Sequence, residues 1–136
     1  MKYKFLEHTA DIKFQAYGKN IQEVFENCGL ALFKSIYSGK IKNVLKKEIK
    51  LRGRDAESLL YNFLEEFLFL LDSEGFLASK IKNIKIDEKK FKMQCTLLGD
   101  LSKNYSIETS VKAVTYNEMF IKKEKGRIIA QVVLDV

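Results

Sequence analysis

Hydrophobic side chains recur along this chain at two spacings, and these spacings predict where helices and strands lie. Apolar residues at helical spacing fill residues 21–37 and 56–72. Each stretch follows a residue that commonly caps a helix start, Asn20 in the first case and Asp55 in the second. Gly75 stands just beyond the second stretch, where a left-handed residue often ends a helix. We therefore predict a helix over each stretch.

Alternating apolar and polar positions predict strands elsewhere. The clearest case is residues 89–98, where Phe91, Met93 and Cys95 alternate with polar side chains, as in a half-buried antiparallel strand. Residues 98–104 are predicted to form a loop. The same alternation, interrupted by turn residues, predicts further strands over residues 2–6, 12–17, 44–52, 77–86, 105–115, 118–123 and 127–134.

Two helices among seven or eight strands predict an α+β fold. We expect a single domain over residues 1–136, with the two helices packed on one face of a mostly antiparallel, multi-stranded sheet. If the first and last strands lie in one sheet, the two ends of the chain come together.

Two aspartates stand out because of where this pairing would place them. Asp11 ends the segment Glu7–Asp11, and Asp135 closes the apolar run 128–134. A carboxylate there is costly to desolvate unless it is paired or binds a cation. Oxygen ligands are those that Ca²⁺ and Mg²⁺ prefer. Because most surface carboxylates are merely solvated, the residues alone favour solvated side chains, with a hard-cation site formed by Asp11, Asp135 and the terminal carboxylate of Val136 as the alternative.

Composition narrows the class of protein. The chain is 46% hydrophobic and 31% charged, which suits a packed globular domain rather than a disordered one. No apolar run reaches the length of a membrane span, and the charged start lacks the apolar stretch of a signal peptide. We therefore expect a cytoplasmic protein that does not bind membranes. Cys28 and Cys95 are expected to be buried, reduced thiols.

The candidate chemistry indicates a binding protein rather than an enzyme. The sequence has no glycine-rich phosphate-binding motif and no serine in a nucleophile elbow. His8, the only histidine, is expected to donate a structural hydrogen bond to a carboxylate of its own turn, with a general base as the alternative. A metal-dependent hydrolase that used Asp11 and Asp135 would lack further acidic ligands and a recognisable nucleophile.

The basic balance of the chain supports a second hypothesis. The formal net charge is +6, and lysines are densest between Lys80 and Lys92. Clustered cations attract nucleic acid by releasing counterions. An RNA-binding module that uses the Lys80–Lys92 hairpin is therefore the alternative function. A solvated sheet face is the plainer interpretation, because no aromatic side chains stand among these lysines to stack on bases.

Several groups of residues, in this order and in a chain of this length, resemble the archease family. They are Glu7–Ile12 with Ala16–Gly18, Asp55–Leu60, Asp72–Gly75, Val111–Tyr116 and Val132–Val136. The resemblance implies a non-catalytic partner of the RtcB-type GTP-dependent RNA ligase, which joins RNA ends in tRNA splicing. Such a partner promotes transfer of GMP onto the ligase's active-site histidine and helps the ligase turn over, so that it reaches RNA only through the ligase.

The resemblance also implies roles for particular residues. The metal-binding aspartates of the family match Asp11 and Asp135, with Val136 as a further oxygen donor. Ca²⁺ is the first candidate for the bound ion, followed by Mg²⁺ and Mn²⁺. This chain has Asn117 where the family usually has a histidine after the Thr-Tyr pair, and an amide cannot titrate. We expect His8 and Asn117 to support the site or to contact the partner.

Overall fold

The computed structural model of the chain describes residues 1–8 and 10–136, so Thr9 of the first motif lies outside the described residues. In the described part, two α-helices and one short 3-10 helix, η1, lie among seven strands. In chain order these elements are β1 (Tyr3–Leu6), β2 (Ile12–Gly18), α1 (Ile21–Ile36), β3 (Leu45–Arg52), α2 (Ala56–Glu74), β4 (Phe76–Asp87), β5 (Lys92–Leu101), η1 (Ser102–Asn104), β6 (Ala113–Glu124) and β7 (Arg127–Asp135).

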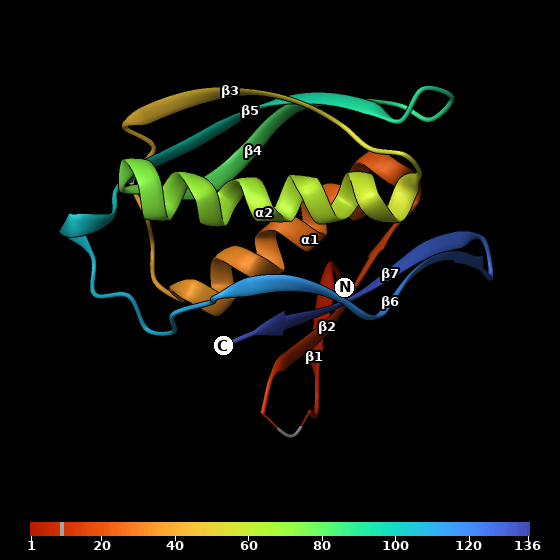
Figure 1. Ribbon diagram of the computed structural model, residues 1–136, viewed down its shortest axis with the longest axis horizontal. Coiled ribbons are helices and arrows are strands. Elements are labelled where there is room, and N and C mark those ends of the chain that lie inside the picture. The colour runs from red at the N-terminus through yellow and green to blue at the C-terminus, as the bar shows by residue number, and fades with distance from the viewer. Residues whose placement is uncertain (9) are drawn as a thin grey trace.

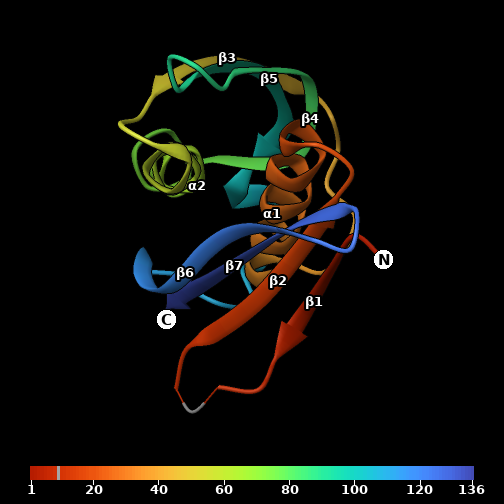
Figure 2. The ribbon, with the colours of Figure 1, turned by 90° about the vertical axis from the view of Figure 1, so that its right-hand side faces the viewer.

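The strands form two antiparallel sheets, and the helices lie between them. One sheet has the strand order β1-β2-β7-β6, and the other has the order β3-β5-β4. Figure 1 shows the three-stranded sheet on one side of α1 and α2 and the four-stranded sheet on the other, and Figure 2 shows the same layers after a quarter turn. The predicted α+β fold with helices packed on antiparallel strands is confirmed, and the strands are divided between two sheets.

The helices begin where their caps predict. The Asn20 side chain accepts a hydrogen bond from the Glu23 N–H at 2.9 Å, and Asp55 forms a reciprocal capping box with Ser58. Gly75 ends α2 with a left-handed φ of 62°. Phe69, on the outer side of α2, is exposed. Neither of these helices, in the part of the chain that the structure describes, is long and apolar enough to cross a membrane.

Phenylalanine rings join the layers in one core. Phe14 from β2 and Phe25 from α1 are fully buried, and the Phe25 ring stacks on the ring of Phe63 in α2 at 5.9 Å. Burying each such ring stabilises the fold by roughly 2–3 kcal/mol. Cys28 and Cys95 are buried, free thiols, as expected. Burial raises the pKa of both thiols, that of Cys95 to about 12.

Two sequence predictions were wrong in the second half of the chain. Residues 98–104 are not a loop throughout, because β5 continues to Leu101, which pairs with Phe76. The strand predicted over residues 105–115 begins only at Ala113. Before Ala113 the chain crosses the end of α1, where its N–H groups bond to a helix carbonyl instead of to a strand.

Candidate functional site

Asp11 and Asp135 both lie next to the last residue pair that joins β2 and β7. Ile12 pairs with Leu134, so Asp11 directly precedes β2 and Asp135 is the last residue of β7. Successive side chains of a strand point to opposite faces of the sheet. Since Leu134 is fully buried, Asp135 lies on the outer face, where it is exposed. The chain ends therefore meet as expected, although β2 rather than β1 pairs with β7.

A histidine and a lysine bond to the same acidic residue, Glu118 of β6. His8 Nε2 donates to Glu118 Oε2 at 3.2 Å, and Lys13 Nζ donates to Glu118 Oε1 at 3.0 Å. These bonds, first from Lys13 and then from His8, hold the pKa of the Glu118 carboxyl below its usual value. The bond expected within the turn of His8 is not formed, because His8 Nδ1 lies 3.7 Å from Asp11 Oδ2.

Glu118 reaches this site because β6 is irregular. The pairing of β6 with β7 shifts between Thr115 and Phe120, and Glu118 has a left-handed φ of 53°. Such bulges re-aim side chains. The side chain of Gln131, itself almost fully buried, donates to the main-chain oxygen of Glu118 at 2.8 Å and so fixes the bulge.

An aromatic pair and one hydrogen bond tie this part of β6 to α2. The rings of Tyr61 and Tyr116 stack with centroids 4.3 Å apart and an angle of 8° between their planes. Glu65 of α2 accepts a hydrogen bond from the N–H of Val114 at 2.7 Å. Val114 lies just before the bulge and Tyr116 lies within it, so the two contacts hold the segment that carries Glu118 against α2.

Asp11 and Asp135 meet some of the requirements of a cation site, but a third ligand is not obvious. Neither carboxylate forms an ion pair with lysine or arginine among the described residues. His8 Nδ1, beside Asp11, is a buried polar atom without a hydrogen-bond partner in the described part. No group of three or more His, Cys, Asp and Glu side chains gathers within residues 1–8 and 10–136. A third ligand would therefore have to be a main-chain oxygen.

The structure places the two remaining candidate residues differently. Val136 directly follows Asp135, and its side chain packs partly buried against the core. Asn117 is exposed on the β6 bulge, between Tyr116 and Glu118 in the chain. Val136 is thus next to Asp135, and Asn117 is next to Glu118.

Sequence reasoning missed Glu118 and Lys13 as parts of this site. A signal existed for Lys13, because it alternates with Ile12 and Phe14 and must share the outer face with Asp11. No comparable signal existed for Glu118, since the shift in pairing that turns its side chain toward His8 leaves no mark in the sequence.

The fold and this site define a small α+β protein that presents two carboxylates and a histidine where two strand ends meet. Comparison with known protein families assigns this protein to one of them, since the model of the archease protein family matches residues 3–136. The chain belongs to the archease family.

Individual relatives match nearly the whole chain. "Protein archease" of Methanosarcina barkeri is 42% identical, with 99% of this chain and 96% of that protein covered. "Protein archease-like" of Drosophila melanogaster is 39% identical, with 89% of this chain and 80% of that protein covered. The solution structure of Methanobacterium thermoautotrophicum protein 1598 has 37% identity and a TM-score of 0.84, and covers 98% of both chains.

A more distant structure shows the same fold. The crystal structure of a Thermotoga maritima archease, described as a possible chaperone, superposes with a TM-score of 0.67 at 21% identity. It covers 98% of this chain and 96% of its own. The two-sheet arrangement is therefore shared at low sequence identity.

Proposed function

We propose that this protein activates a GTP-dependent RNA ligase of the RtcB type and catalyses no step itself. The observation that supports this most directly is its membership of the archease family, with carboxylates at the ends of β2 and β7. The protein promotes transfer of GMP onto the ligase's active-site histidine and helps the ligase to turn over. In this role the RNA ends that are joined, in tRNA splicing, are held by the ligase.

The same proposal includes a divalent cation held by Asp11, Asp135 and the main-chain oxygen of Val136. Ca²⁺ is the first candidate, and Mg²⁺ and Mn²⁺ follow, because all three donors are oxygen atoms. When bound, the cation supplies fixed positive charge at the surface that meets the ligase. The residues around it act as supports: Lys13 and His8 hold Glu118, and His8 Nδ1 faces Asp11.

Activation without catalysis requires that the protein bind one state of the ligase more tightly than another. A partner shifts a conformational equilibrium only by its difference in affinity for the two states. We propose that this protein prefers the state of the ligase that accepts GMP. The acceleration should then saturate once each ligase molecule carries one bound activator.

The test is the rate at which ligase–GMP forms from labelled GTP, with and without this protein. We expect acceleration by the wild type, a strong loss with Asp11→Ala and no change with Asp72→Ala, which removes an exposed acid on α2. No acceleration by the wild type, or consumption of GTP by this protein alone, would contradict the proposal. Full acceleration by Asp11→Ala would remove Asp11 and the cation from it.

A further inference from the structure

The outer face of the three-stranded sheet carries most of the net positive charge of the chain. We call this surface the basic face, and the strand registers align its side chains in four rows across β3, β5 and β4: Lys46–Leu98–Lys80, Glu48–Thr96–Lys82, Lys50–Gln94–Lys85 and Arg52–Lys92–Asp87. Seven of these side chains are cationic and two are acidic, so the basic face holds +5 of the net charge of +6.

The two acids leave most of these cations uncompensated. Glu48 accepts a hydrogen bond from the Thr96 hydroxyl at 3.0 Å and lies 3.7 Å from Lys46 Nζ. Asp87 accepts two backbone N–H groups of its own hairpin turn. The other six cations form no ion pair with any residue that the structure describes. Like charges on neighbouring strands repel, so an anionic ligand would stabilise this face.

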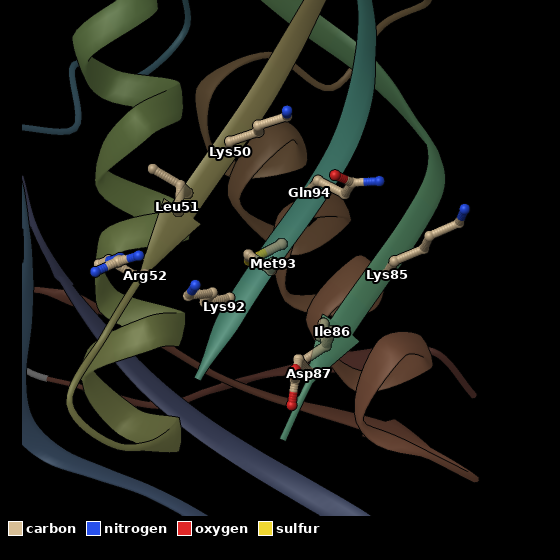
Figure 3. Close-up of a pocket in the computed structure, with 9 residues that line it drawn as sticks. All are labelled: Lys50, Leu51, Arg52, Lys85, Ile86, Asp87, Lys92, Met93 and Gln94. Atoms are coloured by element: carbon tan, nitrogen blue, oxygen red, sulfur yellow. The ribbon is translucent and has the colours of Figure 1, made fainter. Parts of the chain in front are cut away.

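The basic face is hollowed and open to solvent. Two adjoining depressions, each about 560 Å³, share Lys50, Lys85 and Gln94. Figure 3 shows these three residues side by side across β3, β5 and β4, with both helices behind the sheet. Because the helices cover only the inner side, no element of the described chain lies over the basic face in Figure 1.

We propose that the basic face binds the phosphate backbone of a folded RNA stem. Lys50 and Arg52 on β3 lie two residues apart, as do Lys80 and Lys82 on β4, which is about 7 Å along each strand, and the three strands span roughly 10 Å. Lysines act as point charges that suit single phosphates, whereas paired carboxylates are better matched by the forked donors of arginine. Phosphate contacts of this kind are independent of base sequence.

The composition of the basic face argues against two other occupants. No aromatic side chain lies on it, so it lacks the stacking platform that binds unpaired bases, whereas double-stranded RNA is recognised by shape and backbone. Leu98 is its one large apolar side chain, which gives a lipid surface little to bury. The inference goes beyond ligase activation and is tested without a ligase.

The test is fluorescence anisotropy of the full-length chain with two labelled RNA hairpins of unrelated sequence. We expect similar affinity for both hairpins and weaker affinity for an unpaired RNA strand. Affinity should fall as salt rises, with a log–log slope of about −0.9 per phosphate contacted. The triple variant Lys50→Gln/Lys85→Gln/Lys92→Gln should weaken binding about tenfold or more and reduce the slope by about three.

Two further variants distinguish the loss of this particular site from a general loss of positive charge. Lys2→Gln/Lys4→Gln/Lys123→Gln removes the same charge from exposed positions outside the basic face and should change affinity little. Lys50→Arg/Lys85→Arg/Lys92→Arg keeps the charge and should keep most of the binding, so it also controls for folding.

Three results would overturn the inference. The first is that neither hairpin binds in a salt-dependent way, and the second is that the two triple Lys→Gln variants lose affinity equally. The third is that the protein binds anionic vesicles or an acidic peptide more tightly than RNA.

Discussion

At the scale of single residues, two carboxylates beside the ends of one strand pair are expected to repel each other. Asp11 precedes β2 and Asp135 ends β7, and the side chains of Lys13 and His8 bond to Glu118 rather than to them. Lys13 donates to Glu118, and His8 turns only its unpartnered Nδ1 toward Asp11. A bound cation would relieve the repulsion, whereas a purely structural role would leave it uncompensated.

We expect Asp135→Asn to stabilise the protein without a bound cation and to remove the stabilisation that a bound cation provides. With chelator present, Asp135→Asn should raise the free energy of unfolding by a few tenths of a kcal/mol, because it removes like-charge repulsion. With millimolar Ca²⁺ present, the Tm of the wild type should rise and that of Asp135→Asn should not, since a ligand stabilises only the state that binds it. Thermal unfolding followed by circular dichroism measures both. An equal rise of both Tm values with Ca²⁺ would place the ion elsewhere.

Glu118 gives a prediction about pH. Its folded pKa lies below the unfolded value because Lys13 and then His8 bond to the carboxylate. Its contribution to stability is therefore present above the unfolded pKa, about 4.3, and is lost as pH falls through the lower folded pKa. Glu118→Gln should be less stable than the wild type at pH 7, and the difference should shrink below pH ~4. A difference in Tm that stays constant from pH 7 to 3 would show that charge is not the cause.

At the scale of elements, β4 and β5 approach each other more closely at Gly99 than a side chain allows. A Cβ added at Gly99 would lie 2.1 Å from the carbonyl oxygen of Leu77, and both atoms belong to paired backbones that cannot move apart alone. Gly99 pairs with Ala78 just before the pairing of β4 with β5 shifts, and the two strands stay paired from there to Phe76 and Leu101.

We therefore expect Gly99→Ala to destabilise the protein by about 3 kcal/mol, the upper range for overpacked sites. Gly126→Ala is the matched control, since nothing lies within 4 Å of its added Cβ. The control should cost about 1 kcal/mol, because Gly126 has a left-handed φ of 78°. Urea unfolding of both variants compares the two costs. Equal losses would show that backbone conformation, not the contact with Leu77, constrains Gly99.

Helices and strands were predictable from the sequence to the extent that local patterns set them. Asn20 and Asp55 mark both helix starts correctly, because capping depends on neighbouring residues alone. Residues 105–112 alternate like a strand, yet Glu108 and Thr109 donate their N–H groups to the Ile36 carbonyl at the end of α1. That contact joins residues far apart in the chain, so no local pattern could reveal it.

The candidate site was predictable to the same extent. The two aspartates could be paired from the order of strands, whereas Glu118 depends on a bulge whose place is set by the pairing of β6 with β7.

At the scale of the whole molecule, the two sheets share one core because both pack on the same helices. α1 contacts strands of both sheets, and so does α2. Phe63 lies near the centre, with its ring 5.9 Å from that of Phe25 and 4.8 Å from that of Phe67. Neither sheet can therefore lose its packing while the other keeps it.

Phe63→Ala tests this coupling. We expect a loss of about 3–5 kcal/mol, the usual cost of removing a buried ring, and one cooperative transition, as for most small domains. Amide hydrogen exchange should show the protection of β2 and of β5 falling together. Faster exchange in only one sheet would mean that the sheets unfold separately.

The orientation of Asp135 also depends on the opposite end of its strand. Glu124 pairs with Arg127 across a turn of two residues, and Asp135 lies eight residues further on, roughly 26 Å away. If one residue were added beside this turn and the turn still held two residues, the pairing of β7 with β6 would slip by one and all later side chains would exchange faces. Leu134 would then meet water, and Asp135 would enter the core. A change in the length of a distant hairpin therefore threatens the acidic site, whereas a change in the turn's sequence, such as Gly126→Ala, affects only the stability of the turn.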